Sequence, residues 1–152
     1  MKEIPISKIY EAISAVSDGR IEKKEENIYQ VISSDHSKAY TVVLKENLAT
    51  SNDNATYWQH YAGYPIIAVL LYEKEIEMNP ELLQDFKSVP WKTMNQKNKN
   101  DYEKSIQEFL LPFQEEEREK IRKENEKIEE EEEVMKLNLE IKGNRKPLVI
   151  LS

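Results

Sequence analysis

Cysteine is absent from this chain of 152 residues. Its absence excludes a disulfide framework and any metal site built on thiolates, and it suits a reducing compartment. Histidine is scarce as well, because His36 and His60 are the only two and they lie far apart in sequence. No H-E-x-x-H or other ligand spacing surrounds either of them, so we expect no native metal site.

Glycine occurs only three times, at Gly19, Gly63 and Gly143. Loops that hold phosphates against the backbone need several closely spaced glycines, so neither a dinucleotide-binding loop nor a P-loop can be assembled. A G-x-S-x-G nucleophile motif is missing too. We therefore expect no nucleotide cofactor, and kinase and dehydrogenase activities are excluded.

Long apolar runs are also missing. The longest, Tyr64 to Tyr72, is far shorter than the ~20 residues that span a bilayer. The N-terminus has an acid at position 3 and lacks the apolar segment of a signal peptide. We expect a soluble, cytoplasmic protein with no membrane partner.

The chain has an excess of negative charge. The formal net charge is -7, and residues 114–133 carry most of it, with eleven glutamates and five basic residues. Such runs usually form solvated faces. The length fits one domain with its own hydrophobic core.

The first 50 residues predict a helix followed by a small sheet. Apolar residues recur at helical spacing over 6–17, and Gly19 provides a C-terminal stop. Residues 20–34 indicate two strands joined near Glu26–Asn27, and residues 39–44 form the most strand-like run. A three-stranded antiparallel meander is the simplest arrangement.

Helices dominate the prediction for the middle of the chain. Residues 51–54 offer several N-caps for a short helix that reaches Tyr61 and ends at Gly63. Residues 65–75 can be read as a buried helix or a strand, and Pro65 favours the helix. Further helices are expected to begin at Asn79–Pro80 and to span 101–111.

The C-terminal third predicts a charged helix and a hairpin. Residues 114–133 favour a helix, but Ile121 and Ile128 are its only apolar positions, and the glutamates at its end should fray the last turn. Residues 134–141 and 147–151 resemble strands joined at Gly143–Asn144. An isolated hairpin is marginal in water, so it needs cover from another surface. We expect residues 114–152 to mediate formation of a homo-oligomer, by exchange between two copies, and the alternative is that the hairpin folds back onto residues 20–44 of its own chain.

The predicted fold class is therefore α+β. It consists of a small antiparallel sheet packed by amphipathic helices, with a protruding acidic helix and a C-terminal β-hairpin. The predicted units are a globular domain at 1–113, the acidic helix at 114–133 and the hairpin arm at 134–152.

Residues 51–64 hold the densest group of rings, amides and imidazole. Tyr57, Tyr61 and Tyr64 share a stripe at helical spacing, which is typical of a core and also of the wall of a ligand pocket. An Asp–His pair such as Asp53 and His60 would be a workable general base. The ligand-binding candidates in this segment are Asn52, Asn54, Tyr57, Trp58, Gln59, Tyr61 and Tyr64.

Residues 90–102 form the second candidate segment, with Trp91, Lys92 and Asn95 as its ligand-binding candidates. Lysines with interleaved aromatics can grip single-stranded nucleic acid. The acidic total and the lack of arginine here argue against that role and favour a solvated loop with Trp91 in the core. Both Trp58 and Trp91 are expected to be mostly buried.

No motif specifies a reaction, so the sequence leaves three functions open. The first is a non-catalytic cytoplasmic module that binds a protein or a small molecule. The alternative is a small hydrolase that uses Asp53 and His60. A weak binder of single-stranded nucleic acid is the third.

Overall fold

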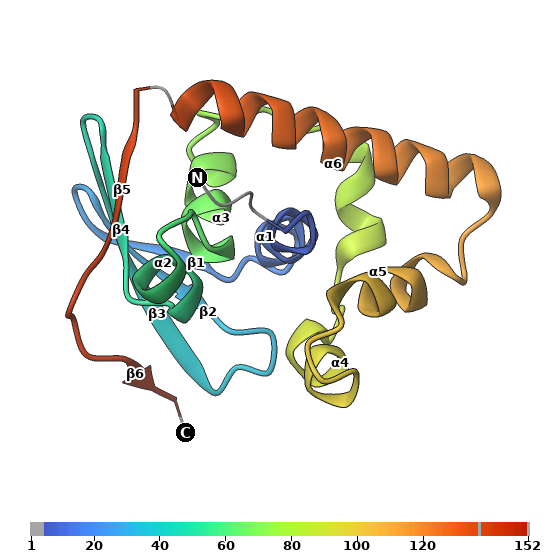
Figure 1. Cartoon of the computed structure of the whole chain (residues 1–152), viewed down its shortest axis with the longest axis horizontal. Coiled ribbons are helices and arrows are strands. Elements are labelled where there is room, and N and C mark those ends of the chain that lie inside the picture. The colour runs from blue at the N-terminus through green and yellow to red at the C-terminus, as the bar shows by residue number, and fades with distance from the viewer. Residues whose placement is uncertain (1–4, 137, 152) are drawn as a thin grey trace.

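The computed structural model describes residues 5–136 and 138–151. They form a mixed α+β fold in which an open, mostly antiparallel six-stranded sheet is covered by helices (Figure 1). In chain order the elements are α1 (Ser7–Ser17), β1 (Ile21–Glu25), β2 (Ile28–Ile32), β3 (Lys38–Lys45), β4 (Leu48–Ser51), α2 (Asn54–Gln59), α3 (Tyr64–Tyr72), the 3-10 helix η1 (Pro80–Phe86), α4 (Trp91–Lys97), α5 (Tyr102–Leu110), α6 (Glu115–Lys136), β5 (Glu140–Gly143) and β6 (Val149–Ile150). The predicted fold class is confirmed.

The sheet is a meander extended at one edge. Strands β1 to β4 pair with their neighbours in antiparallel fashion, and β5 joins β4 in parallel. The turn between β1 and β2 has Asn27 at φ 71°, where the sequence predicted the junction. The predicted three-stranded meander thus gains a fourth strand, β4, which ends at the first of the residues predicted as helix caps.

Helix α1 is the centre of the core. It packs against α3, η1, α5 and α6, and α3 in turn covers the sheet (Figure 1). Small residues such as Ala12 and Ala15, both fully buried, let these neighbours approach. The helix ends as predicted, because Gly19 at φ 65° donates its backbone N–H to the carbonyl of Val16.

The prediction for residues 65–97 is correct in part. Most of residues 65–75 belong to α3, which ends at Tyr72 and is almost entirely buried. The helical interpretation of this segment is therefore confirmed. No helix within the described residues is long and apolar enough to cross a membrane. Residues 91–97, predicted as part of a loop, instead form α4, whose first residue, Trp91, is in the core as expected.

The acidic helix does not protrude, and this part of the prediction is wrong. Helix α6 runs along the body of the molecule, where Ile121 and Ile128 are both fully buried (Figure 1). Glu124 accepts a hydrogen bond from the backbone N–H of Asn79, which adds a polar attachment to the two apolar ones. The helix continues to Lys136 through the glutamates that were expected to fray.

The prediction of a C-terminal hairpin is also wrong. Strand β5 pairs with β4, and β6 pairs with Lys38 and Ala39 of β3, so each joins the main sheet separately. Leu137, part of the predicted strand 134–141, lies outside the described residues. The sheet edges supply more hydrogen bonds to these short strands than they could give each other.

Homo-oligomer formation through residues 114–152 stays a prediction. Its premise has weakened, because Ile121 and Ile128 are covered within the chain, although Leu148 and Ile150 stay exposed. Light scattering at micromolar concentration tests it.

Candidate functional site

A cavity of about 820 Å³ opens between α1, α2, α4 and the loop that joins β2 to β3. Its wall combines aromatic rings, side-chain amides and charged groups, which is typical of sites for small polar molecules. The lining residues are Lys8, Glu11, Arg20, Ser33, Ser34, Tyr40, Asp53, Asn54, Ala55, Trp58, Gln59, Tyr61, Tyr64, Trp91, Lys92, Asn95, Gln96, Asn100 and Tyr102.

Lys8 and Glu11 form an ion pair in the wall of this cavity. The Lys8 Nζ lies 3.7 Å from Glu11 Oε2, beyond hydrogen-bond range, and 4.4 Å from the centroid of the Tyr102 ring. Burial raises the pKa of the Glu11 carboxyl, although Lys8 opposes the shift. For Lys8 burial acts to lower the pKa, but the attraction of Glu11 and other groups outweighs it and the pKa is raised. The ammonium is therefore held in its charged form.

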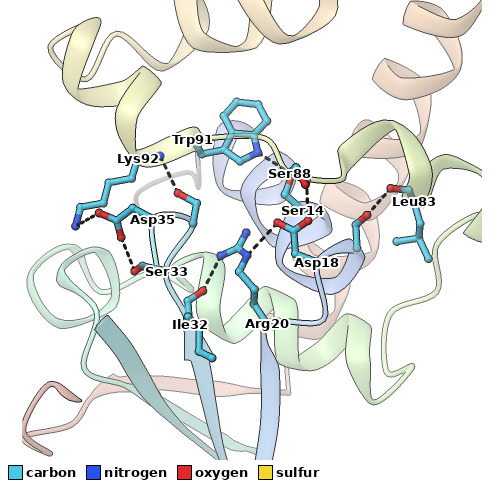
Figure 2. A network of polar contacts seen from close by, with 12 residues as sticks. Ser14, Asp18, Arg20, Ile32, Ser33, Asp35, Leu83, Ser88, Trp91 and Lys92 are labelled. Atoms are coloured by element: carbon cyan, nitrogen blue, oxygen red, sulfur yellow. Dashed lines mark hydrogen bonds and ion pairs between the residues drawn. The ribbon is translucent and has the colours of Figure 1, made fainter. Parts of the chain in front are cut away.

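Arg20 is almost completely buried at the base of the cavity. Its Nε donates to Asp18 Oδ2 at 3.2 Å, and its Nη1 donates to the carbonyl of Ile32 at 2.6 Å (Figure 2). These bonds join the end of α1 to the end of β2. The guanidinium charge is thus partly neutralised inside the protein, and the side chain has a fixed position.

Helix α4 is attached to this region by its first two residues. The indole N–H of Trp91 donates to Ser14 Oγ at 2.7 Å, which satisfies the one polar atom of a buried ring (Figure 2). Lys92 places its Nζ 3.0 Å from Asp35 Oδ2 and 3.1 Å from Ser37 Oγ. The rim of the cavity is therefore cross-linked to the β2–β3 loop.

Asp35 holds that loop together. Burial opposes ionisation of its carboxyl, but hydrogen bonds from Ser37, Ser33 and Lys92 outweigh this effect and hold the pKa well below its usual range. The carboxylate stays charged at neutral pH and keeps Lys92 in place (Figure 2).

Asp53 is committed to the protein's own backbone. Its side chain caps α2 by accepting from the Thr56 N–H at 3.1 Å, and it accepts from the hydroxyls of Thr56 and Ser51. Gly63 passes so close that an added Cβ would lie 2.0 Å from Asp53 Oδ2. This carboxylate positions α2 and the start of α3 and has little capacity left for a substrate.

His60 and Asp53 are not brought together as a catalytic pair. His60 is exposed at the C-terminal end of α2, with φ 61°, and it is outside the lining of the cavity. Within the described ranges no hydrogen bond joins it to Asp53. Their proposed role as a general base stays a prediction, and the geometry gives it no support.

Nine of the twelve residues singled out from the sequence line the cavity. Besides Asp53, they are Asn54, Trp58, Gln59, Tyr61, Tyr64, Trp91, Lys92 and Asn95. The three that do not line the cavity are His60, Asn52 and Tyr57. Asn52 bonds the sheet to the C-terminal segment through Thr41 N and Lys146 O, and Tyr57 packs against Gly143 of β5.

Trp58 corrects one expectation. It was expected to be buried, but 67% of its surface is exposed, while Trp91 is 1% exposed. Residues 54–59 form a single short helix at the surface, and only Thr56 within it is buried. The indole of Trp58 therefore stands at the cavity with an accessible face.

The contribution of α1 to the cavity was missed. Ser7, Glu11 and Ser14 recur at i, i+4 and i+7, a polar stripe that is normally solvated. In the fold all three are buried, and Glu11 lines the cavity together with Lys8 of the same helix. The signal that could have identified them is the small size of Ala12 and Ala15 on the same helix, which permits packing on more than one side.

Tyrosine hydroxyls complete the cavity. Burial, followed by the nearby carboxylates, raises the pKa of Tyr40 to about 12, and burial raises the pKa of Tyr61 and Tyr64 as well. All three phenols are therefore protonated donors at neutral pH. The Tyr40 and Tyr64 rings pack edge to face with centroids 6.0 Å apart, which fixes their positions.

No group of three or more histidine, cysteine, aspartate or glutamate side chains that could hold a metal ion occurs in the part of the chain that the structure describes. The cavity offers instead hydrogen-bond donors and acceptors, ring faces and charged groups of both signs.

Comparison with known proteins identifies a family but no activity. The chain belongs to the family described as Uncharacterised conserved protein UCP014422, whose model matches residues 1–139. No curated protein and no solved structure matches the chain.

Proposed function

We propose that this protein is a non-catalytic binding protein that takes a small polar molecule with a ring or similarly flat apolar part into the cavity. The observation that carries the proposal is the composition of the wall, in which an accessible indole and several phenols lie among side-chain amides. Rings supply contact area and amides supply direction, and together they recognise polar molecules with an apolar face.

The rigidity of the surroundings supports binding. Asp53 caps α2, Arg20 joins α1 to β2, and Lys92 is held by Asp35. A wall whose charged groups are already fixed loses little conformational freedom when a ligand enters. The hydroxyls bonded to the side chains of Asp53 and Lys92 belong to Ser51, Thr56 and Ser37, which are outside the cavity lining, so the arrangement supports recognition better than covalent chemistry.

The same geometry weakens the nucleic-acid alternative. Trp91 lies in the core with its indole N–H bonded to Ser14, so it cannot stack on a base. Lys92, the cavity lysine of that segment, is engaged by Asp35.

A hydrolase is the second candidate, and one observation favours it. Glu11 is a buried carboxyl with a raised pKa in the wall of a cavity, which is the usual condition of a general acid. If catalysis occurs, we expect Glu11 rather than His60 to take part. Loss of a hydrolytic activity in Glu11→Gln but not in His60→Gln would favour this candidate over binding alone.

Binding can be tested by nuclear magnetic resonance. A chemically diverse fragment library is screened against ¹⁵N-labelled protein, with the indole N–H of Trp58 as reporter in the unmodified protein and the backbone N–H of Gln59, another cavity residue, as reporter in every variant. We expect ligands that shift this signal, and we expect Trp58→Ala to weaken them by about tenfold or more, since it removes the accessible ring.

Tyr72→Ala is the matched control, because Tyr72 is another exposed aromatic residue and lies outside the cavity lining. It should leave affinity unchanged. A library that yields no ligand at the cavity, or ligands equally affected by both variants, would refute the proposal.

A further inference from the structure

The ammonium of Lys8 is the most unusual group in the cavity. The exposed fraction of this side chain is 12%, and its charge is retained, yet its contact with Glu11 is longer than a normal hydrogen bond. An ammonium carries three donors, and a buried charge is costly unless its donors are used. Glu11 offers only the ion pair at 3.7 Å.

The position of this ammonium is nevertheless fixed. It lies above the Tyr102 ring, and the Lys8 backbone belongs to the first turn of α1, which is packed in the core. Lys8 is therefore a preorganised donor at the surface of the cavity and not a mobile surface lysine.

Tyrosine side chains line the same space. Tyr40, Tyr61 and Tyr64 line the cavity, and among the described residues their hydroxyls take part in no hydrogen bond. A ligand that satisfies both the ammonium and these hydroxyls must present several hydrogen-bond acceptors.

The other basic groups of the cavity already have partners. Three basic residues line the cavity, Lys8, Arg20 and Lys92, against the acids Glu11 and Asp53. Asp53 is already surrounded by donors from Ser51 and Thr56. Lys92 and Arg20 are likewise engaged (Figure 2), which leaves Lys8 as the cation with unused donors.

We propose that the cavity recognises an oxyanion, a carboxylate or a phosphate on a small ring-bearing molecule, and that Lys8 binds it with the hydroxyls of Tyr40, Tyr61 and Tyr64 beside it. This inference rests on the proposed binding function and specifies the ligand class. The ring of the ligand lies toward Trp58, and the oxyanion lies toward α1. Glu11 competes with the ligand for the ammonium.

The test uses matched probe pairs at roughly 0.15 M salt, where weak surface attraction is screened. Benzoate is compared with benzamide, and phenyl phosphate is compared with phenol, by titration of the Trp58 indole signal. Inorganic phosphate is titrated separately. We expect an anionic member to bind about tenfold tighter than its neutral counterpart. The tighter of benzoate and phenyl phosphate identifies the oxyanion.

Variants of the ion pair assign the contact. Lys8→Gln should weaken the anionic probe by about tenfold or more and leave the neutral one unchanged. Lys104→Gln removes the same charge from an exposed position outside the cavity and should have no effect. Glu11→Gln should strengthen the anionic probe, because a competing carboxylate is gone, and it remains informative if Lys8→Gln folds poorly.

Equal affinity of charged and neutral probes, an unchanged affinity in Lys8→Gln, or a weaker one in Glu11→Gln would overturn the inference. If neutral library members bind at Trp58 while all the anionic probes fail, the oxyanion assignment is wrong and the binding function stands. If neither class binds, both are wrong.

Discussion

Removing Ile121 and Ile128 should detach α6 from the body of the protein. They lie seven residues apart on one face, are fully buried, and are the apolar residues that hold the middle of a helix of 22 residues. Replacing a buried isoleucine by alanine costs ~2–5 kcal/mol, from lost transfer energy and the cavity left behind. Two such losses give about 4–10 kcal/mol if they add, as separate sites usually do.

That sum is comparable with the ~5–15 kcal/mol that stabilises a whole domain. The Ile121→Ala/Ile128→Ala protein should therefore lose amide protection over 115–136 in hydrogen exchange and unfold at much lower urea. Lys123→Ala/Glu130→Ala is the control, because these positions are also seven apart but exposed, and the pair leaves the net charge unchanged. Equal protection of α6 in both double variants would show that the helix is not held by its isoleucines.

Three other substitutions test separate parts of the structure. Trp91→Phe leaves the hydroxyl of buried Ser14 without its donor and should lower the free energy of unfolding by roughly 1–3 kcal/mol. Trp58→Ala, at an exposed position, should change it by about 0.5 kcal/mol or less. Thermal unfolding measures both, and the opposite order would contradict the placement of the two indoles. Asp85→Asn should stabilise the protein at pH 7 and not at pH 4. Burial and Glu117 raise the pKa of Asp85 to about 6, so the folded state holds the proton on this carboxyl more tightly than the unfolded state does. The stability gained from that proton is present at low pH and is lost as pH rises through about 6. Because solvent screens this side chain we expect less than about 1 kcal/mol, and a gain of equal size at both pH values would argue against the shift. Gly143→Ala places a Cβ 2.6 Å from the Tyr57 ring, so it should loosen β5 and lower the free energy of unfolding by roughly 1–3 kcal/mol. Gly19→Ala meets no neighbour within 4 Å and should lower it by about 1 kcal/mol because of the positive φ. Only Gly143→Ala should speed hydrogen exchange of the amide of Ser51, which pairs with β5.

The elements that the sequence predicted well are those with a complete local signal. Helix α1 has apolar spacing and Gly19 as a stop, and β1 and β2 have a turn at Asn27. Strand β4 lacked such a signal, because its four residues run directly into the caps of α2. Strands β5 and β6 were assigned to each other because a hairpin is the nearest pairing in sequence, while their actual partners are distant in the chain.

The same distinction explains the site. Rings and amides in residues 53–95 were found because those groups are conspicuous in sequence. Lys8, Glu11 and Arg20 were missed because a charged side chain near a helix surface is normally solvated, and only packing on several sides of α1 buries it. The exposure of Trp58 was missed for the converse reason, since tryptophan is usually buried and the short α2 leaves it uncovered.

The parallel pairing of β4 with β5 has a consequence for the order in which the molecule assembles. It joins Leu48 to Glu140 and closes a loop of roughly 90 residues, for which (3/2)RT ln n gives about 4 kcal/mol of chain entropy before any constant term. The β1–β4 meander closes much shorter loops and should form first, with β5 added late and released early. Gly143 of β5 lies directly against Tyr57, the neighbour of Trp58 in α2. Release of this last strand would therefore free one side of α2, so the entrance of the cavity should open and close with the least stable edge of the sheet.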